Sequence, residues 1–168
     1  HSGEHIFSGI VHSRFGYDNV GFHLSDNIVT MDFNGVLTTD EVREVETAVN
    51  EVIVKNLPVE ITYPSKEELK TLDYRSKIEI EGQVRIVTIP GVDVCACCAP
   101  HVKKTGEIGM LNVQSLSNYK GGVRISILSG FRALAEERKK SQVISSISGT
   151  LSANQELLPE LVEKLKQS

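Results

Sequence analysis

The chain opens with the stretch His1-Ser2-Gly3-Glu4-His5-Ile6-Phe7-Ser8-Gly9-Ile10. Apolar residues recur at helical spacing through Phe15, so residues 2–15 are predicted to form an amphipathic helix. Residues four positions apart lie about 40° apart around a helix, so His1 and His5 share one face. Whether these two imidazoles form part of a metal site depends on further ligand residues elsewhere in the chain.

The composition is that of an ordinary one-domain globular protein, with 168 residues, 40% hydrophobic and 24% charged. A net charge of −4 argues against a surface dedicated to nucleic-acid backbone, although a few cations can still contact phosphate. No apolar run reaches the roughly 18 residues that span a bilayer, and no signal peptide is visible. We therefore expect a cytoplasmic protein with no membrane partner. Because the chain lacks an initiator Met and starts on a candidate ligand, we also expect a fragment of a longer protein.

Strands and helices are interspersed along the chain. Strands are predicted at residues 20–24, 28–33, 59–63, 84–89, 92–94, 108–116 and 122–128, with turns at 25–27 and at Gly121-Gly122. Further helices are predicted from a capping box at Thr38 to about Asn56, after Ser65, and over about 130–147 and 154–167 with Gly149 as the break. Hairpins at both ends with helices between them predict an α+β fold with a mainly antiparallel sheet packed with helices.

A second pair of metal-ligand residues lies far downstream. Cys97 and His101 are separated by three residues, where a strand gives way to a Pro-containing turn. Together with His1 and His5 they provide three imidazoles and one thiolate, a set that suits Zn²⁺. We predict a zinc site between the first helix and this strand-to-turn segment.

The remaining histidines and cysteines have no partners of this kind. His12 is expected at the surface, and His23 lies in a strand that borders the same pocket in this interpretation. Cys95 and Cys98 are expected to be packing residues, because cysteines this close in sequence are poor disulfide partners.

The opening five residues also spell H-x-x-E-H, the signature of inverzincin peptidases. That interpretation needs a downstream acidic ligand, and Glu79 and Glu81 lie in a charged segment with no further signature. A peptidase also has no use for the Cys97–His101 pair. We therefore assign Glu4 as a helix-start carboxylate favoured by the helix macrodipole.

Three motifs together resemble a known family. They are His1-Ser2-Gly3-Glu4-His5, Cys97-Cys98-Ala99-Pro100-His101 and Thr105-Gly106-Glu107-Ile108-Gly109. In order and spacing they are similar to the HxxxH, CxxxH and TGxIG motifs of the alanyl-tRNA synthetase editing domain and of the free-standing AlaX-type editing proteins, within the threonyl/alanyl-tRNA synthetase second additional domain family. Residues 37–42, 55–59, 122–125 and 157–165 are similar in character, so the resemblance covers nearly the whole chain.

The resemblance implies zinc-dependent hydrolysis of mischarged Ser- or Gly-tRNA(Ala), with His1, His5, Cys97 and His101 as both metal ligands and catalytic set. Two alternatives stay open, a non-catalytic tRNA-binding or structural zinc module and editing of Ser-tRNA(Thr).

The resemblance implies Asn19 as a substrate-binding residue, because family members carry a polar residue in the loop after the first helix. We also nominate His23, and Arg124 with Lys103 and Lys104 for phosphate or the terminal adenosine. The main-chain N–H groups of Thr105 and Gly106 are expected to stabilise a developing oxyanion, because Gly allows close backbone approach.

The chain departs from the family pattern where Cys98-Ala99-Pro100 replaces Gly-Gly-Thr, at the ester-binding end of the implied pocket. Residues 1–148 are predicted to form the editing-like domain, and residues 149–168 a C-terminal helix that begins a linker to a missing downstream region. That missing region also suggests a homodimer.

Overall fold

The computed structural model describes residues 1–168 as two compact units, His1–Gly130 and Phe131–Ser168. The second unit contains α4 (Phe131–Leu151), the short 3-10 turn η2 (Gln155–Leu157) and α5 (Leu158–Gln167). None of the helices in the chain is both long and apolar enough to cross a membrane. Whether an editing-like domain ends at Gly130 or at the expected residue 148 stays a prediction.

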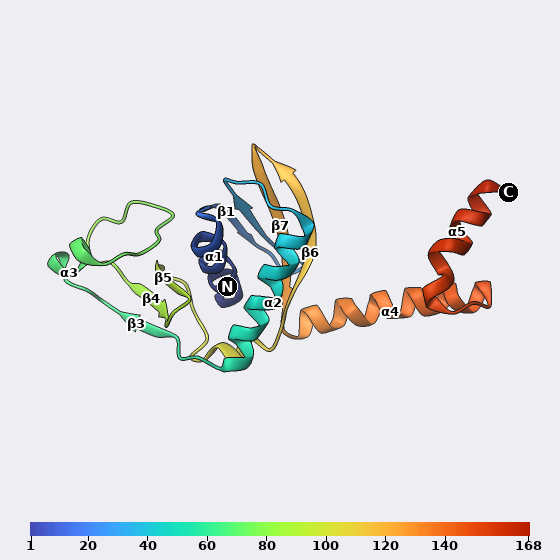
Figure 1. The fold of residues 1–168 in the computed structure, drawn as a ribbon. Coiled ribbons are helices and arrows are strands. Elements are labelled where there is room, and N and C mark those ends of the chain that lie inside the picture. Colours follow the sequence, from blue (N-terminus) through green and yellow to red (C-terminus); the bar gives the residue numbers. More distant parts are fainter. The chain divides into compact units, whose positions relative to one another are not determined.

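The first helix, α1 (Ser2–Phe15), lies at the centre of the first unit (Figure 1). Residues 2–11 are all buried, so the helix is enclosed on every side rather than amphipathic as expected. Ile6, Phe7 and Val11 are fully buried in the main core. A helix with buried polar residues needs internal partners for them, which the site described below provides.

The long helix α2 (Thr39–Lys55) packs beside α1. Its predicted capping box is present, because the Thr38 side chain accepts from the Glu41 N–H and the Glu41 carboxylate accepts from the Thr38 N–H. Val45 and Val49 bury one face in the core, and Asn56 ends the helix in the left-handed conformation.

A four-stranded antiparallel sheet covers one side of α1 (Figure 1). Its strand order is β1 (Asn19–Leu24), β2 (Val29–Phe33), β7 (Gly122–Ser129) and β6 (Leu111–Tyr119). The predicted β1–β2 and β6–β7 hairpins are therefore both confirmed. The second hairpin turns at Lys120 and Gly121, both at positive φ, whereas Gly122 already belongs to β7.

A smaller three-stranded antiparallel sheet contains β3 (Glu60–Thr62), β4 (Ile86–Ile89) and β5 (Asp93–Ala96). The short helix α3 (Lys66–Thr71) connects β3 to a long irregular segment that returns to β4. Strand β5 packs against α1 and leads directly into the segment 97–101. The α+β class with antiparallel sheets is confirmed.

Two predicted boundaries are wrong. The strand expected from residue 108 begins only at Leu111, because residues 105–108 form the 3-10 turn η1 (Thr105–Ile108), which the hydrogen bond from the Gly109 N–H to the Gly106 carbonyl closes. Helix α4 also continues through Gly149, and the chain breaks only at Ser152, which adopts a positive φ. A single glycine costs a helix about 1 kcal/mol, which does not suffice to end it.

Gly9 sets how closely α1 approaches β5, and its substitution tests that packing. A Cβ at Gly9 would lie 2.7 Å from the Val92 carbonyl oxygen and 2.8 Å from Asp93 Cβ. We expect Gly9→Ala to destabilise the protein by about 1–3 kcal/mol, as overpacking does. The control Gly149→Ala meets no atom within 4 Å and should be neutral or stabilising. Thermal unfolding of both variants, followed by circular dichroism, measures this; equal midpoints would contradict the packing argument.

Candidate metal centre

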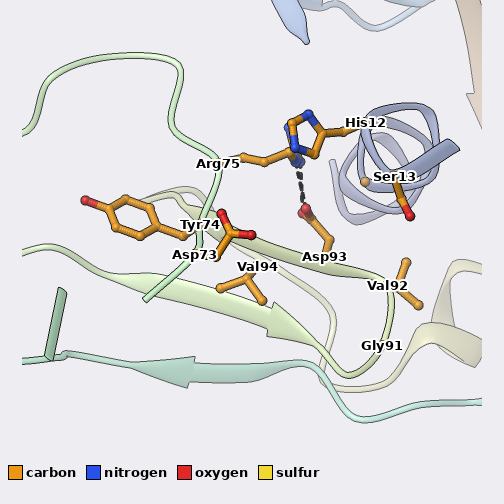
Figure 2. Close-up of a pocket in the computed structure, with 10 residues that line it drawn as sticks. His12, Ser13, Asp73, Tyr74, Arg75, Gly91, Val92, Asp93 and Val94 are labelled. Atoms are coloured by element: carbon orange, nitrogen blue, oxygen red, sulfur yellow. Dashed lines mark hydrogen bonds and ion pairs between the residues drawn. The ribbon is translucent and has the colours of Figure 1, made fainter. Parts of the chain in front are cut away.

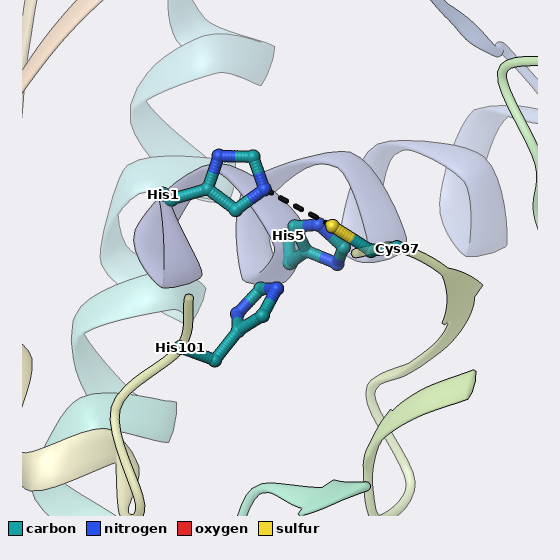
Figure 3. Close-up of side chains that lie close together, drawn as sticks. All are labelled: His1, His5, Cys97 and His101. Atoms are coloured by element: carbon teal, nitrogen blue, oxygen red, sulfur yellow. Dashed lines mark hydrogen bonds between the residues drawn. The ribbon is translucent and has the colours of Figure 1, made fainter. Parts of the chain in front are cut away.

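Four side chains that are far apart in sequence meet at the start of α1 (Figure 3). His1 and His5 come from the helix, and Cys97 and His101 come from the segment after β5. One nitrogen or sulfur atom from each lies within 4.8 Å of the others. His1 Nε2 and Cys97 Sγ are hydrogen-bonded at 3.3 Å, and the rings of His5 and His101 stack edge to face with centroids 4.5 Å apart.

His5 is held by a buried carboxylate. Its Nδ1 is hydrogen-bonded to Asp93 Oδ2 at 3.3 Å, and Asp93 forms a two-bond ion pair with the Arg75 guanidinium at 2.7 and 2.9 Å. The arrangement leaves Nε2 of His5 for the cluster, as in carboxylate–histidine–metal sites. Burial lowers the pKa of His5, but hydrogen bonds with Asp93, Cys95 and Cys97 outweigh it and raise the pKa to about 11. A metal ion must therefore displace a proton from this imidazole.

The Arg75–Asp93 pair also borders a cavity of about 230 Å³ (Figure 2). His12 and Tyr74 line the same cavity. Asp93 therefore lies between the cluster, which it contacts through His5, and this cavity, which it lines together with Arg75. The strand residue Asp93 and the loop residue Arg75 were both missed by sequence reasoning, because neither belongs to a ligand motif.

His101 is oriented by the residue next to His1. Its Nδ1 lies 3.0 Å from Ser2 Oγ, which also accepts a hydrogen bond from the Val102 N–H. Its Nε2 is buried and has no hydrogen-bond partner. A buried nitrogen without a partner costs about 1–3 kcal/mol, and ligation of a metal ion would remove that cost.

Cys97 lies in a setting that favours its thiolate. Burial raises the pKa of the thiol, but the neighbouring imidazoles of His101 and His5 and a hydrogen bond from the Ala99 N–H outweigh it and lower the pKa to about 5. The Arg85 guanidinium fixes the surrounding turn by donating to the carbonyls of Cys97 and Ala99 at 2.8 and 2.9 Å. The thiolate is the form that binds metals.

The donor set fits zinc. Zn²⁺ binds imidazole nitrogen at ~2.0 Å and thiolate sulfur at ~2.3 Å, so tetrahedral ligands are roughly 3.5 Å apart. The observed spacing needs only small side-chain shifts. A second group, His5, Asp93 and Cys95, is fully buried, and the Arg75 guanidinium already occupies both oxygens of its carboxylate. The first group is therefore the stronger candidate.

Glu4 lies in the first turn of α1, as the sequence predicted, but it is not only a helix-start carboxylate. Its side chain is completely buried, and its Oε1 accepts hydrogen bonds from Ser8, Asn19 and Lys77 at 2.8, 2.8 and 3.1 Å. Its Oε2 lies 3.8 Å from His5 Nε2 and has no hydrogen-bond partner. One sign of this role is visible in the sequence, because Glu4 stands between the two candidate ligands His1 and His5 on the same helix.

Of the two nominated residues in β1, Asn19 lies beside the cluster and His23 lies at the surface. Asn19 is buried and donates to Glu4 and Ser8, so it belongs to the surroundings of the cluster. His23 is exposed, whereas its neighbour Phe22 packs edge-on against His1 with ring centroids 5.0 Å apart. Successive strand residues point to opposite faces, so Phe22 rather than His23 borders the cluster, and a substrate contact by His23 stays a prediction.

The Thr105 and Gly106 N–H groups are already used within the fold. Thr105 donates to the Leu57 carbonyl at 2.9 Å, and Gly106 donates to Asn56 Oδ1 at 3.1 Å. The structure therefore contradicts the expectation that these groups are free to bind an oxyanion. They tie η1 to the C-terminal end of α2.

Arg124 is engaged by its neighbours on the sheet. It forms a two-bond ion pair with Asp32 at 2.7 and 2.9 Å, and its guanidinium lies 3.8 Å from the centre of the Tyr119 ring. Its side chain is still 40% exposed, so a phosphate contact by Arg124 stays a prediction. Lys103 and Lys104 are exposed.

A second cavity, of about 370 Å³, opens beside the cluster. His1, Ser2, Pro100 and His101 line it. Three of the four candidate ligands are only half-buried, and His5 alone is fully enclosed. A small molecule can therefore approach the cluster from this side.

The fold and the cluster define an α+β domain with a candidate metal centre. Sequence comparison shows which family this domain resembles. Residues 84–126 match the family model described as the threonyl and alanyl tRNA synthetase second additional domain. This segment includes β4, β5, Cys97, His101 and most of the β6–β7 hairpin. This match confirms the resemblance noted from the sequence.

Named relatives extend the similarity to most of the chain. The alanyl-tRNA editing protein AlaX-L of Pyrococcus horikoshii is 29% identical over 170 residues, which are 99% of this chain and 41% of that protein. An alanine–tRNA ligase of Thermotoga maritima is 36% identical over 134 residues, which are 78% of this chain and 16% of that enzyme. The chain thus spans well under half the length of these relatives.

The setting of Cys97 predicts a thiol that loses its proton in mildly acidic solution. In chelator-treated protein, we expect one thiolate absorbance step near pH 5, set by the lowered pKa of Cys97, and no such step in Cys97→Ser. Below that pH the protonated sulfur should also bind metal poorly. Ultraviolet absorbance titration measures the step, and Cys98→Ser, which changes an exposed neighbour, should leave it in place.

Proposed function

We propose that this chain is a zinc-dependent aminoacyl-tRNA deacylase that hydrolyses the ester of mischarged Ser- or Gly-tRNA(Ala). The observation that best supports the proposal is the buried His101 Nε2 without a partner, inside a group of three imidazoles and one thiolate beside an open cavity. The similarity to alanyl-tRNA editing proteins supplies the substrate class.

In this proposal His1, His5, Cys97 and His101 hold the ion. Zinc bound by such a set polarises a carbonyl or lowers the pKa of a bound water to about 7. The residues of the chain do the remaining work. Asp93 and Ser2 fix the ring orientations of His5 and His101, and Arg85 holds the turn that presents Cys97.

The chemical need for such a site is discrimination. A synthetic pocket built for alanine cannot strongly reject an amino acid of nearly the same size, so errors must be removed by a second site. A hydrolytic site can demand the serine hydroxyl, because a buried polar group that pairs with it stays unpaired when alanine is bound. The proposed partner is therefore the aminoacylated 3′ end of a tRNA.

Two other functions are distinguished by the same experiment. Replacement of the family's Gly-Gly-Thr by Cys98-Ala99-Pro100 also fits a non-catalytic zinc or tRNA-binding module. The family that matches residues 84–126 includes threonyl-tRNA synthetase, so Ser-tRNA(Thr) is the alternative substrate.

The test measures deacylation of Ser-tRNA(Ala), Gly-tRNA(Ala) and Ser-tRNA(Thr) together with zinc content. We expect the wild-type chain to hold stoichiometric zinc and to hydrolyse Ser- or Gly-tRNA(Ala) fastest. Cys97→Ala should lose both zinc and activity, because it removes the only thiolate of the set. The matched control Cys98→Ala removes an exposed thiol one residue away and should retain both.

Stoichiometric zinc without hydrolysis of any of the three substrates would overturn the deacylase proposal in favour of the binding module. A full-length relative, such as the alanyl-tRNA editing protein of Pyrococcus horikoshii, should be assayed in parallel as a positive control, because the relatives are longer than this chain.

The role of Asp93 yields a separate prediction. Loss of a carboxylate that orients a ligating histidine typically weakens metal binding about 10- to 100-fold. We expect Asp93→Asn to weaken zinc affinity by this amount in a competition titration with a chromogenic chelator. Asp32→Asn is the matched control, because it breaks an equivalent two-bond ion pair, with Arg124, that does not contact the cluster. An equal loss of affinity in both variants would contradict the orienting role.

A further inference from the structure

We propose that Glu4 binds the α-ammonium group of the aminoacyl ester, through its oxygen Oε2. The inference rests on the proposed deacylase function and adds to it the residue that recognises the charged amine. It implies a substrate class, since esters of amino acids with a free α-amine are accepted and N-blocked ones are not.

The two oxygens of Glu4 have different surroundings. Oε1 is saturated, because Ser8, Asn19 and Lys77 all donate to it. Oε2 accepts no hydrogen bond although it is buried, and it lies 3.8 Å from His5 Nε2. The network around Oε1 therefore fixes the carboxylate and leaves one acceptor directed at the edge of the cluster.

The buried polar atoms that lack a hydrogen bond also point to Glu4 Oε2. Only two buried side-chain nitrogen or oxygen atoms in the chain have no hydrogen-bond partner, Glu4 Oε2 and His101 Nε2. Both lie at the cluster. His101 Nε2 is explained by a metal ion, since an imidazole nitrogen is a ligand atom. Glu4 Oε2 is not part of the ligand set, and its one contact is the 3.8 Å ion-pair distance to His5 Nε2. When that nitrogen binds the ion, Oε2 is left for a donor that arrives with the substrate.

The same side of the cluster already holds a primary ammonium group. Lys77 Nζ lies 3.1 Å from Glu4 Oε1 and 4.6 Å from the centre of the Phe22 ring. Phe22 in turn packs against His1. A carboxylate beside an aromatic face is a typical environment for ammonium groups. The Lys77 side chain is 31% exposed, so a ligand can reach Glu4 by displacing this flexible side chain.

The chemistry of the substrate matches this position. In an aminoacyl ester the α-nitrogen is two bonds from the carbonyl carbon that is attacked. An acceptor for the ammonium must therefore adjoin the atoms that hold the ion, as Glu4 does. A carboxylate–ammonium hydrogen bond formed away from bulk water is among the stronger polar contacts.

The test uses two non-hydrolysable probes and the zinc-loaded chain. One probe is 3′-deoxy-3′-(L-seryl)amino-adenosine, and the other is the same compound with hydrogen in place of the α-amine. We expect the wild-type chain to bind the amine probe about 10- to 100-fold more tightly in calorimetry. In Glu4→Gln this preference should fall to about twofold, because Oε1 keeps its three donors only if the amide NH₂, a donor, takes the place of Oε2.

Lys77→Met is the matched control. It removes a contact to the same carboxylate but leaves Oε2 in place, so the preference for the amine should persist or increase. Zinc content, measured for each variant, should stay at the wild-type level.

The outcomes separate the two proposals. Binding of both probes with equal affinity by the wild-type chain would overturn the role of Glu4 whether or not Glu4→Gln folds, and would leave the deacylase proposal standing. A preference that survives in Glu4→Gln would do the same. Failure of the wild-type chain to bind either probe would overturn both.

Discussion

The enclosure of α1 is the constraint on which the rest of the structure depends. The helix packs against the four-stranded sheet, α2 and β5, and its first ten residues are buried although Ser2, Glu4, His5 and Ser8 are polar. Each buried polar group needs a partner, because an unpaired one costs about as much free energy as several apolar contacts contribute. The partners come from β1, β5 and the loops, and this requirement brings the distant segments together at one place.

The local elements were largely predictable from the sequence because their signals are local. Thr38 and Ser65 each stand three residues before a glutamate, and both capping boxes are present. The two hairpins follow from alternating runs separated by turn residues. The meeting of His1 and His5 with Cys97 and His101 was predictable for a different reason, since each pair has ligand spacing and neither pair suffices to bind an ion alone.

What the sequence could not predict is decided by tertiary packing. Nothing in the sequence says that α1 is covered on both sides, so Glu4 was interpreted only as a helix-start carboxylate and its burial at the cluster was not foreseen. A strand pattern does not say which face is inside, so His23 was nominated when Phe22 lies at the cluster. The N–H groups of Thr105 and Gly106 were expected to face a ligand, but the end of α2 approaches η1 and takes them as donors. Asp93 belongs to no motif and is significant only because β5 places it beside His5.

A four-residue ligand set raises the question of how a site with this many protein ligands serves catalysis, since closed tetrahedral zinc sites are usually structural. The burial of the ligands argues for an asymmetric answer. His5 is enclosed and fixed by the Asp93–Arg75 pair, whereas His1, Cys97 and His101 are half-buried and border a cavity. Cys97 and His101 also lie in a turn rather than in a regular element. Any change of coordination on substrate binding is therefore cheapest on the side of the turn, while α1 keeps His5 and Glu4 fixed. In the proposed deacylase, the rigid helix would position the substrate and the turn would adapt to it.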